Sequence, residues 1–193
     1  MASFDEQLRK AEVAHGHLCA GLVLGVRMAN LGLERLGITD PLGSDRKRLV
    51  VFVEIDRCAT DAISIVTGCR LDKRTLKFRD WGKMVATFVD LATGKAVRIV
   101  AREDSRQRAA ELYPQIEDPN RQQMMAYREL SAEHLFTEQW VKVTVPPEEL
   151  PGNRGERFLC PRCGEGVNFG RFEVIAGERI CLSCAHPELK YWE

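Results

Sequence analysis

Two Cys-x-x-Cys pairs near the end of the chain constrain its fold more than any other feature. Cys160 and Cys163 form the first pair, and Cys181 and Cys184 form the second, with seventeen residues between the pairs. Each Cys-x-x-Cys turn presents two thiolates to one point, and structural Zn²⁺ takes four such ligands in a tetrahedron. The pattern therefore predicts a structural zinc site without an open coordination position. Two disulfides or an iron–sulfur cluster are the alternatives, and the even spacing favours zinc.

The segment that carries these cysteines is too short to bury an apolar core of its own. It follows PPEELPGNRGE, residues 146–156, which contains three prolines, two glycines and no apolar periodicity, as a linker does. We therefore predict a core domain over residues 1–145, a linker over 146–156, and a four-cysteine zinc finger over 157–193 that folds around its metal.

Composition narrows the class of protein. The 193-residue chain has 28 basic and 28 acidic side chains, and this zero net charge predicts no nucleic-acid partner. No apolar run has the length of a membrane span, and the charged start MASFDEQLRKAEVA is unlike a secretory signal. We therefore expect a cytoplasmic protein without a membrane contact. Thiols stay reduced in the cytoplasm, which favours metal ligands or reactive groups over disulfides for the seven cysteines.

The core alternates helical and strand patterns. Apolar residues at helical spacing predict helices over about residues 4–14, 18–37, 58–67, 106–113 and 121–132. Short runs rich in β-branched residues predict strands over 49–55, 76–78, 84–91, 96–101 and 140–145. This order, with a hairpin signal at Thr93-Gly94, predicts an α+β core with a mixed β-sheet flanked by helices.

The stretch HGHLCAG, residues 15–21, is the candidate functional motif of the core. It places His15, His17 and Cys19 at the start of a predicted helix, where unpaired N–H groups stabilise a thiolate. Cys58 also follows a predicted strand and opens a predicted helix, and the carboxyl ends of strands are common places for sites. If the two elements pack side by side, the thiols and imidazoles make either a metal site with an open position or a thiol redox pair.

Ordinary packing is the alternative interpretation of these residues. Cysteine often packs as a small hydrophobic side chain, and histidines in loops are commonly only solvated. Cys69 follows the helix-ending Gly68, and we expect it to pack in the core or at the helix end. His134 and His186 stand apart from the motifs, and we interpret both as ordinary polar residues.

Four segments together resemble the E-subunit family of formylmethanofuran dehydrogenase. They are HGHLCAGLVLGVRMA, VEIDRCATDAISIVTGC, RDWGKMVATFVD and the four-cysteine tail. The resemblance implies a thioredoxin-like core, a treble-clef zinc finger, a homodimer and a metal-binding active site in the core. By this resemblance, His17, Cys19 and Cys58 are the candidate catalytic residues and metal ligands, and they are expected to converge on one point. His15 is expected to be a fourth ligand or a partner of a ligand, and Asp61 to lie near the site.

Three further residues match positions of the family without an assigned role: Glu54, Asp80 and Lys83. The loop RLDKRTL, residues 70–76, departs from the family, in which a glycine-bearing stretch follows the same cysteine. A bulky, charged loop excludes the close backbone approach that glycine allows. A ligand held by that loop in relatives is therefore not expected to bind here in the same way.

The chain has no pterin-binding signature, no ferredoxin-like run of cysteines and no folate or nucleotide motif. We therefore expect an accessory metalloprotein of anaerobic metabolism, with structural zinc in the tail and zinc or another divalent metal at the core His/Cys site. Its reaction, and whether it is an enzyme, stay open. One alternative is a non-catalytic interaction or metal-delivery module that docks to an oxidoreductase through its zinc finger. Another is a zinc-finger regulator of transcription, against which the zero net charge counts.

Overall fold

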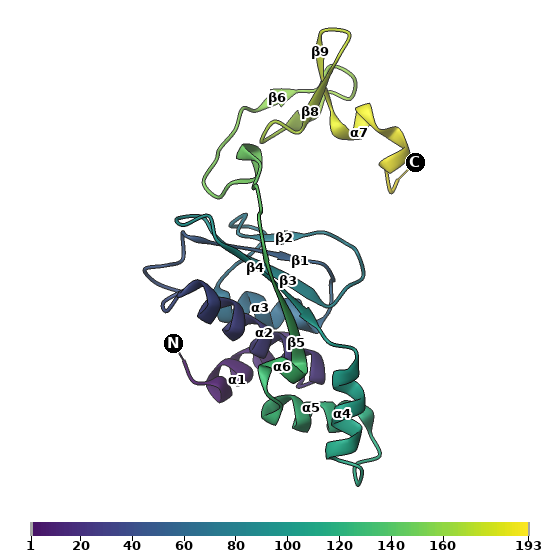
Figure 1. Ribbon diagram of the computed structural model, residues 1–193. Coiled ribbons are helices and arrows are strands. Elements are labelled where there is room, and N and C mark those ends of the chain that lie inside the picture. Colours follow the sequence, from purple (N-terminus) through teal and green to yellow (C-terminus); the bar gives the residue numbers. More distant parts are fainter. Residues whose placement is uncertain (1, 193) are drawn as a thin grey trace. The chain divides into compact units, whose positions relative to one another are not determined.

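The computed structural model describes residues 2–192. The chain divides into two compact units, Met1–Thr144 and Val145–Glu193 (Figure 1). The first unit is a β-sheet with helices packed against it, and the second consists of two short hairpins and a short helix. No helix among the described residues is both long and apolar enough to cross a membrane.

The first unit alternates helices and strands in the order that the sequence predicted. Its helices are α1 (Phe4–His15), α2 (Ala20–Leu36), α3 (Cys58–Thr67), α4 (Asp104–Leu112), α5 (Pro119–Glu129) and α6 (Ala132–Leu135). Its strands are β1 (Leu49–Val53), β2 (Leu76–Phe78), β3 (Val85–Asp90), β4 (Ala96–Ala101) and β5 (Phe136–Val141).

These five strands form one mixed sheet in the order β2-β1-β3-β4-β5. β1 and β2 run parallel, and the other neighbouring strands run antiparallel. Buried side chains of the strands, such as Val51, Phe88 and Ile99, share one apolar core with Leu22 and Leu33 of α2. The predicted α+β class with a mixed, helix-flanked sheet is confirmed.

Two predicted boundaries are wrong. The last strand runs over Phe136–Val141 and not over 140–145, because it pairs antiparallel with β4 from Ala101 to Ala96 and ends opposite Ala96, the first residue of β4. Residues 137–139 of this strand, TEQ, are polar, so the search for alternating apolar residues did not detect its first half. The helix predicted over 121–132 is two helices, α5 and α6, because Leu130 and Ser131 adopt extended backbone between them.

Glycines let α2 approach its neighbours closely. A Cβ atom on Gly25 would lie 2.6 Å from the carbonyl oxygen of Ala59 in α3, and one on Gly32 would lie 2.4 Å from the ring of Phe88 in β3. Neither contact is tolerated by a real side chain, so both positions need glycine. Together with the small Ala59 and Ala62 on α3, Gly25 brings the backbones of α2 and α3 together.

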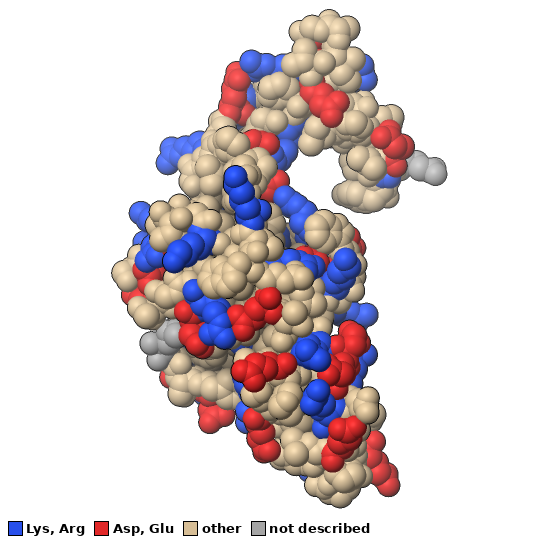
Figure 2. Space-filling model, in the orientation of Figure 1, with Lys and Arg blue, Asp and Glu red and all other residues tan. Residues whose placement is uncertain are grey.

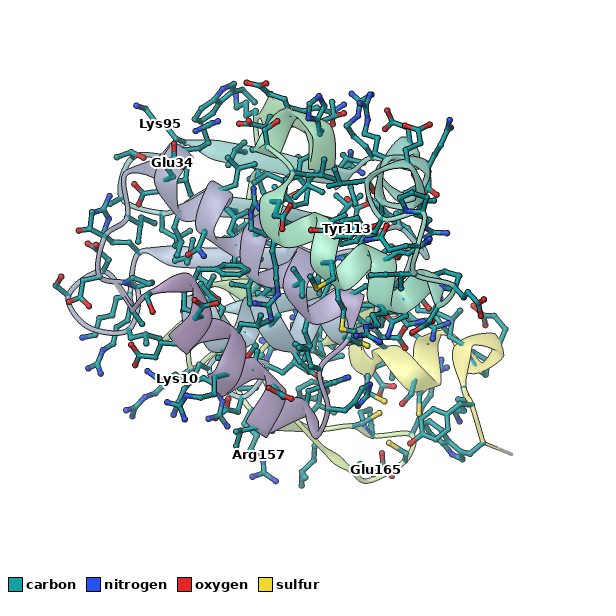
Figure 3. All side chains as sticks on the ribbon, turned by 90° about the horizontal axis from the view of Figure 1, so that it is seen from below. Lys10, Glu34, Lys95, Tyr113, Arg157 and Glu165 are labelled. Carbon is teal, nitrogen blue, oxygen red and sulfur yellow. The ribbon has the colours of Figure 1, made fainter. Side chains whose placement is uncertain are left out.

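Polar contacts fasten α5 along α2. The Arg27 guanidinium of α2 donates to three carbonyls at and just beyond the C-terminal end of α5, at 2.7 to 3.0 Å. At the other end, the Ala20 N–H at the start of α2 donates to Oδ1 of Asn120, at 3.0 Å. α5 is therefore held at both ends, and its first turn borders the start of α2. Figure 3 shows the first unit from its helical side, with α1 carrying Lys10 and α2 carrying Glu34 in front of the strands.

The second unit contains the hairpin strands β6 (Phe158–Leu159) with β7 (Gly166–Val167), and β8 (Phe172–Ile175) with β9 (Glu178–Cys181), followed by α7 (Leu182–Ala185). Its buried cluster is small and includes Cys160, Ile180 and Cys181. A unit with so few buried apolar side chains depends on another source of stability, as small domains held together by a structural metal ion do.

Candidate metal centres

The HGHLCAG motif is the junction between α1 and α2. α1 ends at His15, and Gly16 adopts a left-handed conformation with φ +97°, which a residue with a side chain reaches only at a cost. The sequence predicted Cys19 in the first turn of the helix. In the structure, Cys19 is the N-cap of α2, with extended backbone, and precedes that turn. The sharp reversal at Gly16 is what allows a residue of α1 and the N-cap of α2 to face one another.

His15, His17 and Cys19 lie together. Each offers one ligand atom, and these three atoms all lie within 4.8 Å of one another. The two imidazole rings have centroids 4.7 Å apart. Cys19 is buried, His15 is half-buried and His17 is exposed, so the cluster opens to solvent on the His17 side. This arrangement could hold one metal ion with a position left for a further ligand.

Asp61 orients the His15 ring. Nδ1 of His15 lies 2.7 Å from Oδ2 of Asp61, in the first turn of α3. Because an ionised carboxylate only accepts hydrogen bonds, Nδ1 carries a proton, and in the neutral ring Nε2 is the nitrogen with a free lone pair. Nε2 is the one buried side-chain nitrogen or oxygen among the described residues that has no hydrogen-bond partner. A carboxylate on one nitrogen and an open second nitrogen is the arrangement of metal-binding histidines.

Cys58 lies beside Cys19 but is not one of the three grouped ligands. It is the first residue of α3, and its side chain is half-buried. A Cβ atom on Gly21 would lie 3.0 Å from Cβ of Cys58 and 3.7 Å from Sγ of Cys19. Burial, followed by the contact with the Cys19 thiol, raises the pKa of Cys58. A side chain on Gly21 would therefore crowd both cysteines, and glycine lets α2 and α3 approach closely at this point.

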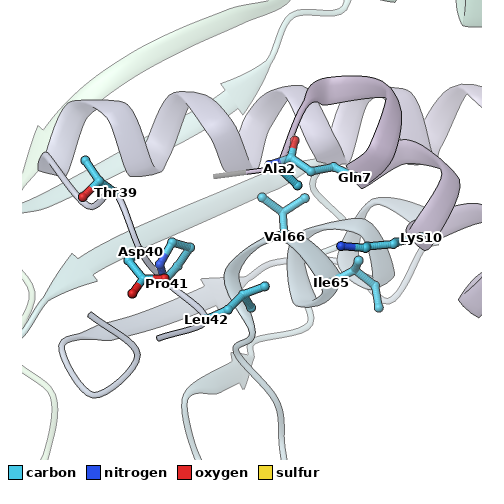
Figure 4. Close-up of a pocket in the computed structure, with 9 residues that line it drawn as sticks. All are labelled: Ala2, Gln7, Lys10, Thr39, Asp40, Pro41, Leu42, Ile65 and Val66. Carbon is cyan, nitrogen blue, oxygen red and sulfur yellow. The ribbon is translucent and has the colours of Figure 1, made fainter. Parts of the chain in front are cut away.

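A small cavity of about 110 Å³ adjoins the first turn of α2. Its walls include Ala20 and Gly21, next to Cys19, and Met84, Arg106 and Tyr127 from the far side. A larger cavity of about 240 Å³ lies elsewhere, between α1, α3 and the loop after α2, where Gln7, Lys10 and Leu42 face it (Figure 4). Of these two cavities, the smaller one borders the motif that contains the histidines and Cys19.

The family positions Glu54, Asp80 and Lys83 shape one edge of the sheet. The buried Glu54 carboxylate accepts two hydrogen bonds from the Arg98 guanidinium, at 2.9 and 2.8 Å. Its backbone carbonyl accepts from the N–H groups of Trp81 and Lys83 and so anchors the turn that contains exposed Asp80. These contacts assign Glu54 to an internal ion pair, in which it supports the strand ends.

The four cysteines of the second unit also gather. Their sulfur atoms all lie within 4.8 Å of one another, and Sγ of Cys163 is 3.8 Å from Sγ of Cys181. A tetrahedron with zinc–sulfur bonds of about 2.3 Å has edges of about 3.8 Å. The Cys181 N–H, as the main cause, lowers the pKa of Cys160 to about 6, while the Cys181 thiol, as the main cause, raises the pKa of Cys184 to about 12. The donor set fits a closed zinc site.

The remaining histidines and cysteine stand outside both clusters. Cys69 is buried in the core with its Sγ 3.7 Å from the carbonyl oxygen of Leu49, and burial raises its pKa to about 11. His186 pairs with Glu173 at 2.7 Å, and His134 contacts the Ser131 hydroxyl at 3.2 Å. All three are held by local packing or polar contacts.

Sequence reasoning missed the residues that hold the core cluster in place. Gly21 and Gly25 are four residues apart, which puts both on one face of α2, and this spacing was a readable signal for close helix packing. Asn120 had no such signal, and Asp61 was expected near the site only from the family resemblance. Asn120 is 100 residues from Ala20 and Asp61 is 46 residues from His15, so only the folded chain brings them together.

The fold and the two clusters define an α+β protein with a four-cysteine candidate metal site and a separate His/Cys cluster. The family described as "FmdE, Molybdenum formylmethanofuran dehydrogenase operon" matches residues 14–149, and the chain belongs to this family. The resemblance seen in the sequence is thereby confirmed.

Two known proteins are similar over nearly the whole chain. A crystal structure of a tungsten formylmethanofuran dehydrogenase FmdE-like protein from Syntrophus aciditrophicus aligns with a TM-score of 0.65 and 21% identity, over 98% of this chain and 95% of that one. This likeness supports the fold. A protein of Archaeoglobus fulgidus named "Probable S-adenosyl-L-methionine-binding protein" is 29% identical over 202 residues. The alignment covers 92% of this chain and 52% of that protein, so the chain spans about half the length of this relative.

Proposed function

We propose that this chain is an accessory metalloprotein. Its core binds a divalent metal, for which zinc is the favoured candidate, through His15, His17 and Cys19, and its tail holds structural zinc. The carrying observation is the buried Nε2 of His15, which has no hydrogen-bond partner and belongs to a group of three ligand atoms within 4.8 Å. An unsatisfied buried polar atom costs about 1–3 kcal/mol, and binding a cation removes this cost.

The ligand types favour zinc among common metals. A thiolate with two imidazoles is a borderline-soft set, whereas magnesium and calcium prefer oxygen ligands. Three protein ligands leave a fourth position, and a metal held in this way supplies Lewis acidity to whatever occupies it. Asp61 keeps the proton on Nδ1 of His15 and aims Nε2 at the cluster, while the buried position of Cys19 shields its sulfur from solvent. We place Cys58 beside this site as a neighbouring thiol.

In the tail, we propose that Cys160, Cys163, Cys181 and Cys184 hold one zinc ion whose role is to fold the second unit. The sulfur separations suit a tetrahedral ion, and little else stabilises this unit. The treble-clef and thioredoxin-like descriptions of the two units remain proposals from the family resemblance.

Metal analysis of the full chain tests the proposal. The wild type purified under reducing conditions should bind two zinc equivalents, and a His15→Ala, His17→Ala double variant should bind one. Replacing His134 with alanine is the matched control and should leave two. Cobalt in place of zinc should show a thiolate charge-transfer band from the core that the double variant lacks. Two equivalents retained by the double variant would overturn the core site.

Exposed apolar residues favour a second candidate function, docking of the second unit to a partner protein. Leu159, Leu189 and Tyr191 are 70%, 76% and 95% exposed, and Trp192 is 48% exposed. Over the face shown in Figure 2, acidic and basic side chains are mixed, which suits a protein partner better than a nucleic acid. We propose an oxidoreductase as that partner in the cytoplasm. Recovery of the same oxidoreductase with the wild type and with a Tyr191→Ser, Trp192→Ser variant would contradict this docking mode.

A further inference from the structure

The core contains three cysteines, of which two lie close together and the third lies apart. Cys19 and Cys58 both lie within 3.7 Å of the point where a Gly21 side chain would begin. Cys69 is at the opposite end of α3, after its last residue, and its Sγ contacts the Leu49 carbonyl. One pair of neighbouring thiols and one isolated thiol therefore coexist in the same unit.

The pair lies where α2 packs closely against α3. Cys19 is the N-cap of α2 and Cys58 opens α3, so both thiols come from helix starts that Gly21 and Gly25 allow to meet. Cys58 is outside the group of three ligand atoms, so the metal proposed above does not account for it. A half-buried thiol beside a buried one leaves one sulfur within reach of an oxidant in solution and places the other to attack a mixed disulfide formed on the first.

We propose that Cys19 and Cys58 form a reversible disulfide when a small organic disulfide oxidises the metal-free core. One thiol attacks the organic disulfide, forms a mixed disulfide and releases one organic thiol. The second protein thiol then attacks the mixed disulfide, forms the Cys19–Cys58 bond and releases the second organic thiol. The two protein thiols lose two protons and two electrons in total, and the organic disulfide gains them.

This inference rests in part on the proposed function, because Cys19 is assigned both to the metal site and to the disulfide. A sulfur in a disulfide bond no longer carries the thiolate that a metal needs. Metal binding and disulfide formation at Cys19 therefore exclude each other. Oxidation should empty the core site, and metal should protect the pair from oxidation.

The test uses the full chain, reduced, with the core metal removed by a chelator and the tail metal retained. Oxidised glutathione is added, free thiols are alkylated, and disulfide-linked peptides are mapped by mass spectrometry. The expected product links the Cys19 peptide to the Cys58 peptide, and dithiothreitol reverses it. Cys69→Ala is the matched control and should give the same link. Cys19→Ser should stop at a mixed disulfide of glutathione with Cys58, the more exposed of the two thiols.

The outcomes separate this proposal from the metal proposal. If Cys19 and Cys58 link at equal rates with and without added zinc, the disulfide stands and the core metal site does not. If zinc binds the core but glutathione never links the two cysteines, the disulfide proposal is overturned and the metal site stands. Gly21→Ala gives an independent check, since its new Cβ would crowd Cβ of Cys58 and Sγ of Cys19, at 3.0 and 3.7 Å, and it should slow linkage at least several-fold. Linkage of Cys58 to Cys69 instead would also overturn the proposal.

Discussion

His15 and Asp61 come from different helices, and their side chains meet at 2.7 Å, so the carboxylate fixes the proton on Nδ1 and leaves Nε2 for another partner. The pair joins α1 to α3 directly beside the N-cap of α2. Most of the chemistry proposed for the core depends on this contact, because without it the imidazole could rotate or change tautomer.

Replacing Asp61 with asparagine should weaken metal binding in the core and spare the tail. Removing the carboxylate partner of a metal-binding histidine typically costs about 10–100-fold in affinity. The measurement is a competition titration of the full chain with a chromogenic chelator, which resolves the weaker core ion from the tail ion. Asp56→Asn, an exposed aspartate just before α3, is the control and should bind as the wild type does. Equal core affinity in both variants would refute the role of Asp61.

Replacing Cys163 with serine should unfold the second unit and leave the first folded. Structural zinc contributes about 10–16 kcal/mol of apparent binding energy in comparable sites, and this energy is folding energy. We expect the full-length variant to lose one zinc equivalent and to expose the second unit to proteolysis after residue 145. The thermal transition of the first unit should stay unchanged. Retention of full zinc content would show that these cysteines are not the ligands.

Asp90 should give the first unit a defined acid sensitivity. Burial alone would raise the pKa of this carboxyl, but hydrogen bonds from Arg48, Thr93 and the Ala92 N–H outweigh burial and lower it to about 2. Because the folded pKa lies below the unfolded value of about 3.9, the stabilisation is present above about pH 4 and is lost as pH falls through about 2.

Asp90→Asn should therefore lower the free energy of unfolding by about 2 kcal/mol at pH 7 and flatten its dependence on pH between about 4 and 2. Urea unfolding at several pH values measures both effects. Asp72→Asn is the control, since Asp72 is exposed and pairs only on the surface, and it should leave the profile unchanged. A wild-type acid slope in the Asp90 variant would contradict the assignment.

Replacing Gly25 with alanine should destabilise the first unit. The new Cβ would lie 2.6 Å from the Ala59 carbonyl oxygen and 2.7 Å from its Cα, and backbone cannot move aside as a flexible side chain can. Overpacking of this kind costs about 1–3 kcal/mol, although alanine favours helices more than glycine does. Thermal unfolding checks the prediction, and a variant as stable as the wild type would show that α2 and α3 can separate at little cost.

The proposed homodimer is tested by light scattering of the full chain. We expect a particle of twice the 21.8 kDa chain mass at micromolar concentration. A mass that remains at one chain over the whole concentration range would reject the dimer. Denaturing gel electrophoresis without reductant, after oxidation by glutathione, shows whether the Cys19–Cys58 bond forms within one chain.

The sequence alone determined the features that local pattern controls. Short runs rich in β-branched residues located β1 through β4, Gly37 and Gly68 marked the ends of α2 and α3, and the Cys-x-x-Cys spacing located the sulfur cluster. These signals are legible because strand pleat, helix periodicity and a two-residue thiol turn act over a few neighbouring residues.

Only the tertiary structure decided which groups meet across the fold. It paired Nδ1 of His15 with Asp61, brought Asn120 to the start of α2, and left Cys58 outside the group of three ligand atoms that the sequence had expected it to join. It also began β5 at Phe136, because pairing with β4 outweighs a polar sequence. The physical reason is the separation of these groups along the chain. Hydrogen-bond partners that are 46 or 100 residues apart meet only when helices and sheet pack together, and no local periodicity encodes that packing.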